Sequence, residues 1–201
     1  MANLEFDLSS GCIVTNKSIY MGKSGFAYCS NFKLMDIFNN GNHNNMTVEI
    51  LYKYSEGSGN IFGTGTAGGF IFSGTEEKVG SATCIKHTLD YIGSDNGNPH
   101  VYSYKNSINF SAGYWITASF VFKTDSIDWY MNEELITTID HGLLMEEGWG
   151  LGIMCNPIDA SGGVASTDKV AADVAAFRVY DRALTLEEVL SNHRKDNERF
   201  N

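Results

Sequence analysis

Proline, basic residues and long apolar runs are all scarce in this sequence. Only 2 of the 201 residues are proline, beside 21 glycines, a balance that suits many tight turns between strands. The chain has 14 Lys and Arg against 24 Asp and Glu, for a net charge of −10. The acidic balance argues against electrostatic binding of nucleic acid, because neutralising phosphates requires clustered Lys and Arg. No stretch approaches the ~20 apolar residues of a membrane span, so we expect no membrane insertion.

The N-terminus, MANLEFDLSS, lacks the basic start and apolar run of a signal peptide. The protein therefore stays where it is made, leaves by another route, for instance as part of a virion, or has been trimmed from a larger parent. We expect an extracellular or virion-surface location.

The cysteines are widely scattered and show neither a CxxC pair nor zinc-ligand spacing. In a chain of this length they need not form a disulfide framework, and we expect buried free thiols. They are Cys12, Cys29, Cys84 and Cys155.

Length and composition indicate one domain spanning residues 1–201. A hydrophobic content of 43%, with 12% aromatics, excludes wholesale disorder. An all-β domain of this size can bury a stable hydrophobic core without disulfides or structural metals. We find neither an internal repeat nor a domain boundary.

Residues alternate between apolar and polar at the two-residue period of a β-strand in several segments. Apolar faces are expected in three of these segments, residues 46–54, 115–123 and 126–132. Strands of five to nine residues at regular spacing, with few helical patterns, indicate an all-β, two-sheet antiparallel jelly-roll sandwich. The predicted inward-facing residues are Val48, Ile50, Tyr52, Tyr54, Ile116, Ala118, Phe120, Phe122, Ile127, Trp129 and Met131.

The chain closes with a strand followed by one short helix. Residues 172–180 alternate strictly, which puts Phe177 and Val179 on one face and Arg178 and Tyr180 on the other. Thr185 and Glu188 then have the spacing of a capping box. The helix is expected to bury an apolar stripe and to end in charge by Arg194. Its stripe consists of Leu186, Val189 and Leu190.

Three segments together resemble the laminin-G-like members of the concanavalin A-like lectin/glucanase superfamily. They read MTVEILYK, WITASFVFKTDSIDWYMNEELITTI and DVAAFRVYDRALTLEEVLSNH, and they cover residues 46–193 in order. The resemblance implies two antiparallel sheets with one concave face. Glu133 departs from the family pattern, because it stands where the central hairpin usually has glycine and must adopt a positive φ. Arg178, Asp181 and Arg182 are expected to tie the helix to the sheet.

Catalytic motifs are not recognisable. The superfamily's glucanases use Glu-x-Asp-x-x-Glu, but the only Glu-x-Asp here, at Glu5, is followed by serine in the last position. Residues 63–68 match GxGxxG, yet a strand pattern follows where a dinucleotide site needs a helix, so a turn is predicted. Each histidine is expected on the surface or in a loop. They are His43, His87, His100, His141 and His193.

Sugar recognition uses carboxylates and amides that bind vicinal hydroxyls, together with aromatic faces that cover the ring. Such groups occur in two polar loops, with aromatic residues nearby in sequence. The predicted carbohydrate-binding residues are Asp95, Asn96, Asn98, Tyr114, Trp149 and Asn156. The resemblance also implies a Ca²⁺ site of rim carboxylates, for which the candidates are Asp159, Asp168 and Asp173.

These observations favour a non-catalytic recognition module that binds a glycan on a cell or matrix surface. The alternative is a structural, decoration or adhesion protein, for example of a phage virion, that makes protein contacts without a sugar pocket. A third reading is a glycan-cleaving hydrolase with an unrecognised pair of acids. The expected partner is accordingly a glycan or a surface protein.

Overall fold

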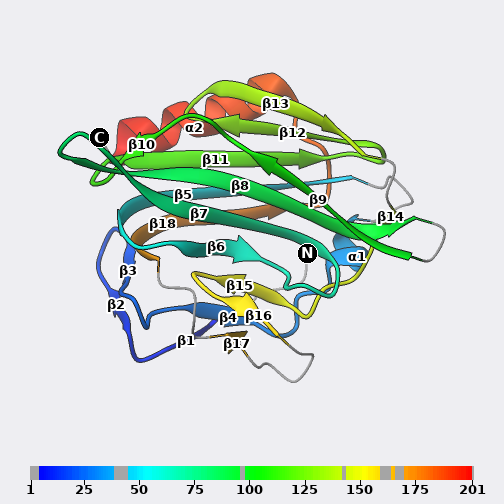
Figure 1. The fold of residues 1–201 in the computed structure, drawn as a ribbon, viewed down its shortest axis with the longest axis horizontal. Helices are drawn as coiled ribbons and strands as arrows, with labels where there is room; N and C mark the ends of the chain where they lie inside the picture. The colour runs from blue at the N-terminus through cyan, green and yellow to red at the C-terminus, as the bar shows by residue number, and fades with distance from the viewer. Residues whose placement is uncertain are drawn as a thin grey trace.

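The fold is a sandwich of two antiparallel sheets that lie face to face, as predicted (Figure 1). A computed structural model describes residues 5–38, 45–95, 98–141, 144–158, 164–165 and 170–200. Within these residues the front sheet has the order β1-β4-β15-β6-β7-β8-β10, and β9 and β14 also pair with β8. Its strands are β1 (Asp7–Leu8), β4 (Ala27–Cys29), β6 (Gly59–Gly63), β7 (Gly69–Val79), β8 (Ala82–Asp95), β9 (Asn98–Lys105), β10 (Phe110–Ser111), β14 (Leu144–Met145) and β15 (Leu151–Ile153).

The back sheet has the order β13-β12-β11-β5-β18-β3-β2. Its strands are β2 (Cys12–Val14), β3 (Ile19–Met21), β5 (Met46–Glu56), β11 (Trp115–Phe122), β12 (Ser126–Met131), β13 (Glu134–Asp140) and β18 (Ala171–Tyr180). The remaining elements are the small hairpin of β16 (Asn156–Pro157) and β17 (Val164–Ala165), and the helices α1 (Leu34–Phe38) and α2 (Leu186–Phe200). Neither helix is long and apolar enough to cross a membrane.

Aromatic rings fill the space between the two sheets. Phe62 and Phe72 of the front sheet meet Phe120 of the back sheet, with ring centroids 5.6 and 4.9 Å from it. Trp129 packs against Phe120 at 5.6 Å and has no exposed surface. The inward faces predicted for residues 46–54, 115–123 and 126–132 are confirmed, since all eleven predicted residues are buried.

The strict alternation predicted for the closing strand is wrong. The register of β18 against β5 shifts between Val174 and Ala176, which leaves Ala175 as the extra residue of a β-bulge. Val174 and, beyond the bulge, Phe177 therefore both contact the core, although they are an odd number of residues apart. Arg178 points to the outer face of the back sheet, where it bonds Asp196 of α2.

Helix α2 begins as predicted, with Thr185 and Glu188 exchanging the two bonds of a capping box. It then extends to Phe200, past the predicted end. The predicted apolar stripe is also wrong in part, because Leu186 is 55% exposed whereas His193 and Asp196 are buried. The helix packs on the outer face of the back sheet, and the side of the helix that contacts the sheet is largely polar.

The surface or loop position predicted for every histidine is wrong for His87 and His193. Both lie in regular elements and are at most 2% exposed. His141 lies in a loop but is buried. No disulfide joins the four cysteines, all of which lie in the described residues; Cys29, Cys84 and Cys155 are buried as expected, while Cys12 is partly exposed.

Candidate functional site

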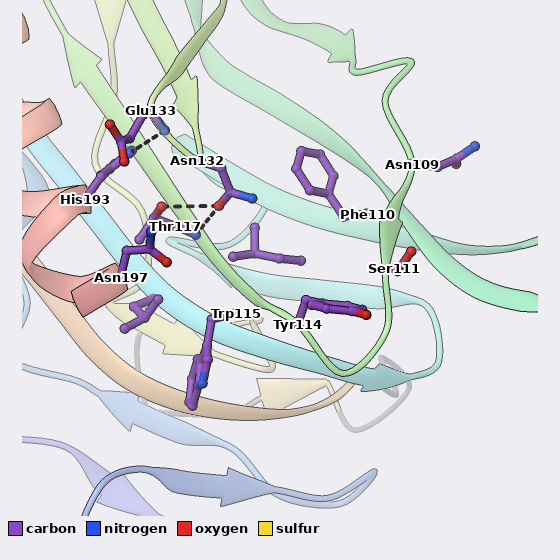
Figure 2. A pocket seen from close by; sticks show the side chains of 12 residues that line it. Asn109, Phe110, Ser111, Tyr114, Trp115, Thr117, Asn132, Glu133, His193 and Asn197 are labelled. Carbon is purple, nitrogen blue, oxygen red and sulfur yellow. Dashed lines mark hydrogen bonds between the residues drawn. The ribbon is translucent and has the colours of Figure 1, made fainter. Parts of the chain in front are cut away.

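A pocket of about 520 Å³ opens beside the C-terminal half of α2, within the ~300–1,000 Å³ range of ligand pockets. Its walls come from the segment around β10 and the start of β11, from the β12–β13 turn and from α2 (Figure 2). The lining residues are Leu51, Asn109, Phe110, Ser111, Tyr114, Trp115, Ile116, Thr117, Asn132, Glu133, His193 and Asn197.

Aromatic side chains form one side of this pocket. Tyr114 is 69% exposed. It follows Gly113, whose φ of +86° is accessible to glycine at little cost. Trp115 is half-buried and held in place, because the Phe200 ring lies 5.2 Å from it and the Lys53 ammonium 4.9 Å over its face. A large exposed ring beside a fixed one offers apolar faces for a ligand that also carries polar groups.

The opposite side is the two-residue turn between β12 and β13. Asn132 and Glu133 have φ values of 46° and 73°, as expected for a hairpin turn with positive φ at both positions. The Asn132 side-chain oxygen accepts bonds from the Thr117 backbone N–H at 2.9 Å and from the Thr117 hydroxyl at 3.3 Å. Its amide nitrogen consequently points into the pocket as an oriented donor (Figure 2).

Helix α2 holds this turn in its strained conformation. The backbone N–H of Glu133 donates to His193 Nδ1 at 3.0 Å, and the Glu133 carboxylate lies 3.0 Å from Arg194 Nε. Positive φ at a non-glycine residue costs roughly 1–3 kcal/mol and persists when its surroundings enforce it. The pocket wall is therefore coupled to the docking of the helix.

A buried chain of hydrogen bonds lies behind the wall. Because His193 Nδ1 accepts a hydrogen bond, the proton of the neutral ring is on Nε2, which donates to the Ser119 hydroxyl at 2.7 Å. Ser119 in turn donates to Glu49 at 3.0 Å. Burial lowers the pKa of His193 to about 4, with a smaller contribution from Arg178 against the raising effects of Asp196 and Glu133. Burial also raises the pKa of Glu49.

This Glu49–Ser119–His193 chain does not have the geometry of a catalytic triad. In a triad the histidine lies between the serine and the carboxylate, whereas here the serine lies between the other two. Ser119 has no exposed surface, and no carboxylate orients the second nitrogen of His193, which accepts a backbone N–H. These residues stabilise the pocket wall.

The predicted carbohydrate-binding residues do not meet in one place. Tyr114 lines the pocket, but Asn98 begins β9 and pairs with Asp95 at the far end of β8. Cys84, which pairs with Ser111 of the pocket, lies about 35 Å from Asp95 along β8 at about 3.3 Å per residue. The side chain of Asp95 and the whole of Asn96 lie outside the described part of the chain.

Trp149 and Asn156 lie together around the turn at Gly65, apart from the pocket. Trp149 donates its backbone N–H to the Thr64 carbonyl at 2.8 Å. A Cβ at Gly65 would lie 3.3 Å from the Trp149 ring and 2.4 Å from the carbonyl oxygen of Pro157, the residue after Asn156. The structure therefore brings these two predicted residues together, without Tyr114 or Asn98.

Asp173, the one described member of the predicted calcium set, is bonded by other residues. Its carboxylate accepts the Ser18 hydroxyl at 3.2 Å and lies 3.3 Å from Lys53 Nζ. Asp159 and Asp168 lie outside the described residues. Within the described part of the chain no three His, Cys, Asp or Glu side chains form a group that could hold a metal ion.

Sequence reasoning missed most of the pocket. The sequence predicts no function for Asn132, and Glu133 stands out only as a departure from the hairpin pattern. His193 was assigned to the surface, although its place four residues after Val189 put it on the buried face of the helix. Glu49 is the clearest missed signal, because it is a charged residue between apolar ones in the middle of a long strand.

The sequence matches no protein-family model and no curated protein. Among solved structures, the binding domain of botulinum neurotoxin DC, in complex with rat synaptotagmin II, matches with a TM-score of 0.66 and 12% identity over 96% of this chain and 47% of that one. The ligand-binding domain of serotype D, in complex with N-acetylneuraminic acid, gives 0.65 and 11% over 96% and 46%. A heptameric SAP-like pentraxin from Limulus polyphemus gives 0.53 and 21% over 74% and 69%.

These likenesses show the fold. The toxin domains and the pentraxin are jelly-roll sandwiches of the concanavalin A-like kind, as the sequence resemblance implied at its broader level. This chain spans about half the length of the toxin structures that it matches.

Proposed function

We propose that this domain is a non-catalytic recognition module that binds a glycan on a cell or matrix surface through the pocket beside α2. The observation that carries the proposal is the combination of an exposed aromatic ring, Tyr114, with an amide donor, Asn132, whose orientation is fixed by Thr117. Aromatic faces and fixed polar groups are what a sugar ring requires. The finer laminin-G-like assignment, and an extracellular or virion-surface location, belong to the same proposal.

The fold neighbours support a recognition role by analogy. One is a toxin domain in complex with N-acetylneuraminic acid, and another is a toxin domain in complex with a protein, synaptotagmin II. Function lies in sites placed on a fold, so the pocket carries more weight than this analogy. Calcium binding by Asp173 together with Asp159 and Asp168 remains a proposal, and Lys53 would have to release Asp173.

A structural or adhesion protein is the second candidate, favoured by apolar side chains on strands at the sheet edges. Ile13 and Val14 of β2 are 62% and 66% exposed, and Leu8 of β1 is 42% exposed. Apolar residues exposed on edge strands are typical of surfaces that contact other proteins. Native mass measurement of the purified chain tests this candidate, which predicts an assembly rather than a monomer.

A glycan array read with and without calcium tests the first proposal. We expect binding that falls about tenfold in Tyr114→Ala, because a stacked aromatic contributes about 1.4 kcal/mol. The matched control is Tyr102→Ala, which removes another partly exposed tyrosine, on β9. Tyr102 pairs with Tyr91, roughly 20 Å along β8 from the partner of Phe110. Absence of binding to any glycan would refute the proposal.

A further inference from the structure

The charge of the pocket indicates which class of glycan it accepts. We infer, on the basis of the proposed function, that the pocket selects an uncharged glycan and that Glu133 is the residue that rejects acidic sugars. Three observations support this inference: the charges on the pocket walls, the hydrogen-bond donors of the pocket and the net charge of the whole chain.

Glu133 is the one ionic side chain among the described residues that line the pocket. Two cations that contact lining residues, Arg194 and Lys53, are each paired with a carboxylate. Arg194 lies 3.0 Å from the Glu133 carboxylate, and Lys53 lies 4.9 Å from the centroid of the Trp115 ring and 3.3 Å from Asp173. His193 supplies no positive charge at neutral pH, because both of its nitrogens are used in neutral form.

The donors on the pocket walls do not suit an anion. A carboxylate or sulfate is held by a guanidinium, an ammonium or several converging backbone N–H groups. The N–H of Glu133 is committed to His193, and that of Thr117 is committed to Asn132. The remaining side-chain donors include the amides of Asn132 and Asn109 and the hydroxyls of Ser111 and Tyr114. These are neutral donors, which suit a hydroxyl or a carbonyl oxygen.

The net charge of −10 works in the same direction, since it repels an approaching anion over the whole surface. A carboxylate on the wall then acts as the repulsive element by which a site discriminates between otherwise similar ligands. The serotype D domain, by contrast, was solved in complex with N-acetylneuraminic acid, which is an acidic sugar.

The test compares matched glycans that differ only in a terminal acidic group, such as a galactose-terminated chain and its sialylated form. Binding is measured at low salt for the wild-type protein, Glu133→Gln and Tyr114→Ala, with Tyr102→Ala as the remote control. We expect the wild type to prefer the neutral glycan. We expect Glu133→Gln to raise the ratio of acidic to neutral binding about fivefold, because it removes a unit charge and releases Arg194. The added binding should weaken as salt is raised.

The outcomes separate the inference from the proposed function. Preference for the sialylated glycan, lost in Tyr114→Ala, would overturn the inference and leave a glycan-binding pocket in place. An unchanged ratio in Glu133→Gln would overturn the role of that residue. No binding to either glycan class, or binding that Tyr102→Ala abolishes and Tyr114→Ala does not, would overturn the proposed function and the inference together.

Discussion

The buried histidine of the core makes the stability of this domain depend on pH. His87 is 1% exposed, its Nε2 meets the Tyr52 hydroxyl, and its ring stacks on Phe72 with centroids 5.1 Å apart. Burial alone lowers its pKa to about 3, from an ordinary value of 6.5. In the native state the ring therefore stays neutral at pH values where the unfolded chain takes up a proton.

The direction and size of the effect follow from this difference. Between pH 6.5 and 3 the unfolded state binds more protons than the native state, so the free energy of unfolding falls as the pH falls through this window. Above pH 6.5 the His87 ring is largely neutral in both the native and the unfolded state, so it causes little loss of stability there. From pH 7 to pH 5 the unfolded state gains about 2 kcal/mol relative to the native state from His87, at about 1.36 kcal/mol per pKa unit.

The perturbation is the double variant His87→Phe, Tyr52→Phe, which replaces the ring without leaving a buried hydroxyl unpaired. Urea unfolding at pH 7 and pH 5, followed by tryptophan fluorescence, gives the pH-dependent loss for each protein. We expect the double variant to lose about 2 kcal/mol less than the wild type over this interval. Tyr52→Phe alone is the matched control, because it removes the hydrogen bond but keeps the titrating group.

The groups that titrate elsewhere do not obscure this comparison. His193, whose pKa burial lowers to about 4, contributes in the same direction, and Glu49, whose pKa burial raises, contributes in the opposite direction. Both are present in the wild type and in each variant. If the double variant and the wild type lose the same free energy between pH 7 and pH 5, the assignment to His87 is refuted.

Two further predictions concern the helix and the pocket. Arg178→Met should lower the free energy of unfolding by about 3 kcal/mol in urea unfolding, because it leaves the buried carboxylate of Asp196 without the guanidinium that it bonds at 2.6 and 2.8 Å. The control is Arg182→Met, which removes an exposed ion pair and should change stability little; equal losses would contradict this account. Gly113→Ala and Gly80→Ala should each cost about 1 kcal/mol, because both glycines have positive φ and open space at the Cβ position. Only Gly113→Ala should also weaken glycan binding, because it precedes Tyr114, and equal binding by both variants would count against the pocket.

The sandwich was predictable from the sequence because its signals are local. Alternation identifies the buried faces of β5, β11 and β12, the capping box identifies the start of α2, and the Asn132–Glu133 pair identifies the hairpin turn. Each of these patterns lies within one element, so its meaning does not depend on distant residues.

The bulge in β18 and the extent of α2 were not predictable in this way. The bulge depends on how β18 pairs with β5, and the alanine at position 175 gives no sequence signal of a bulge. The helix was predicted too short because its buried face is polar beyond Val189. His193 and Asp196 can be buried because they form hydrogen bonds with side chains of the sheet, His193 with Ser119 and Asp196 with Arg178.

The candidate site depends on long-range contacts, which explains why it was largely missed. Segments around Phe110, Asn132 and His193 are far apart in sequence and meet only in the folded sandwich. Asn98 and Asn156, the described residues of the polar loops that suggested a sugar site, do not line the pocket, so loop composition was a poor guide. Tyr114 is the one predicted sugar-binding residue that lines it.

The crystal structure of the domain with a neutral oligosaccharide chosen from the array is the most direct test of the central claim. We expect a sugar ring stacked on Tyr114, with an oxygen about 2.7–3.2 Å from the side-chain nitrogen of Asn132. An oligosaccharide bound at the β8–β9 hairpin or beside Trp149, with this pocket empty, would contradict it.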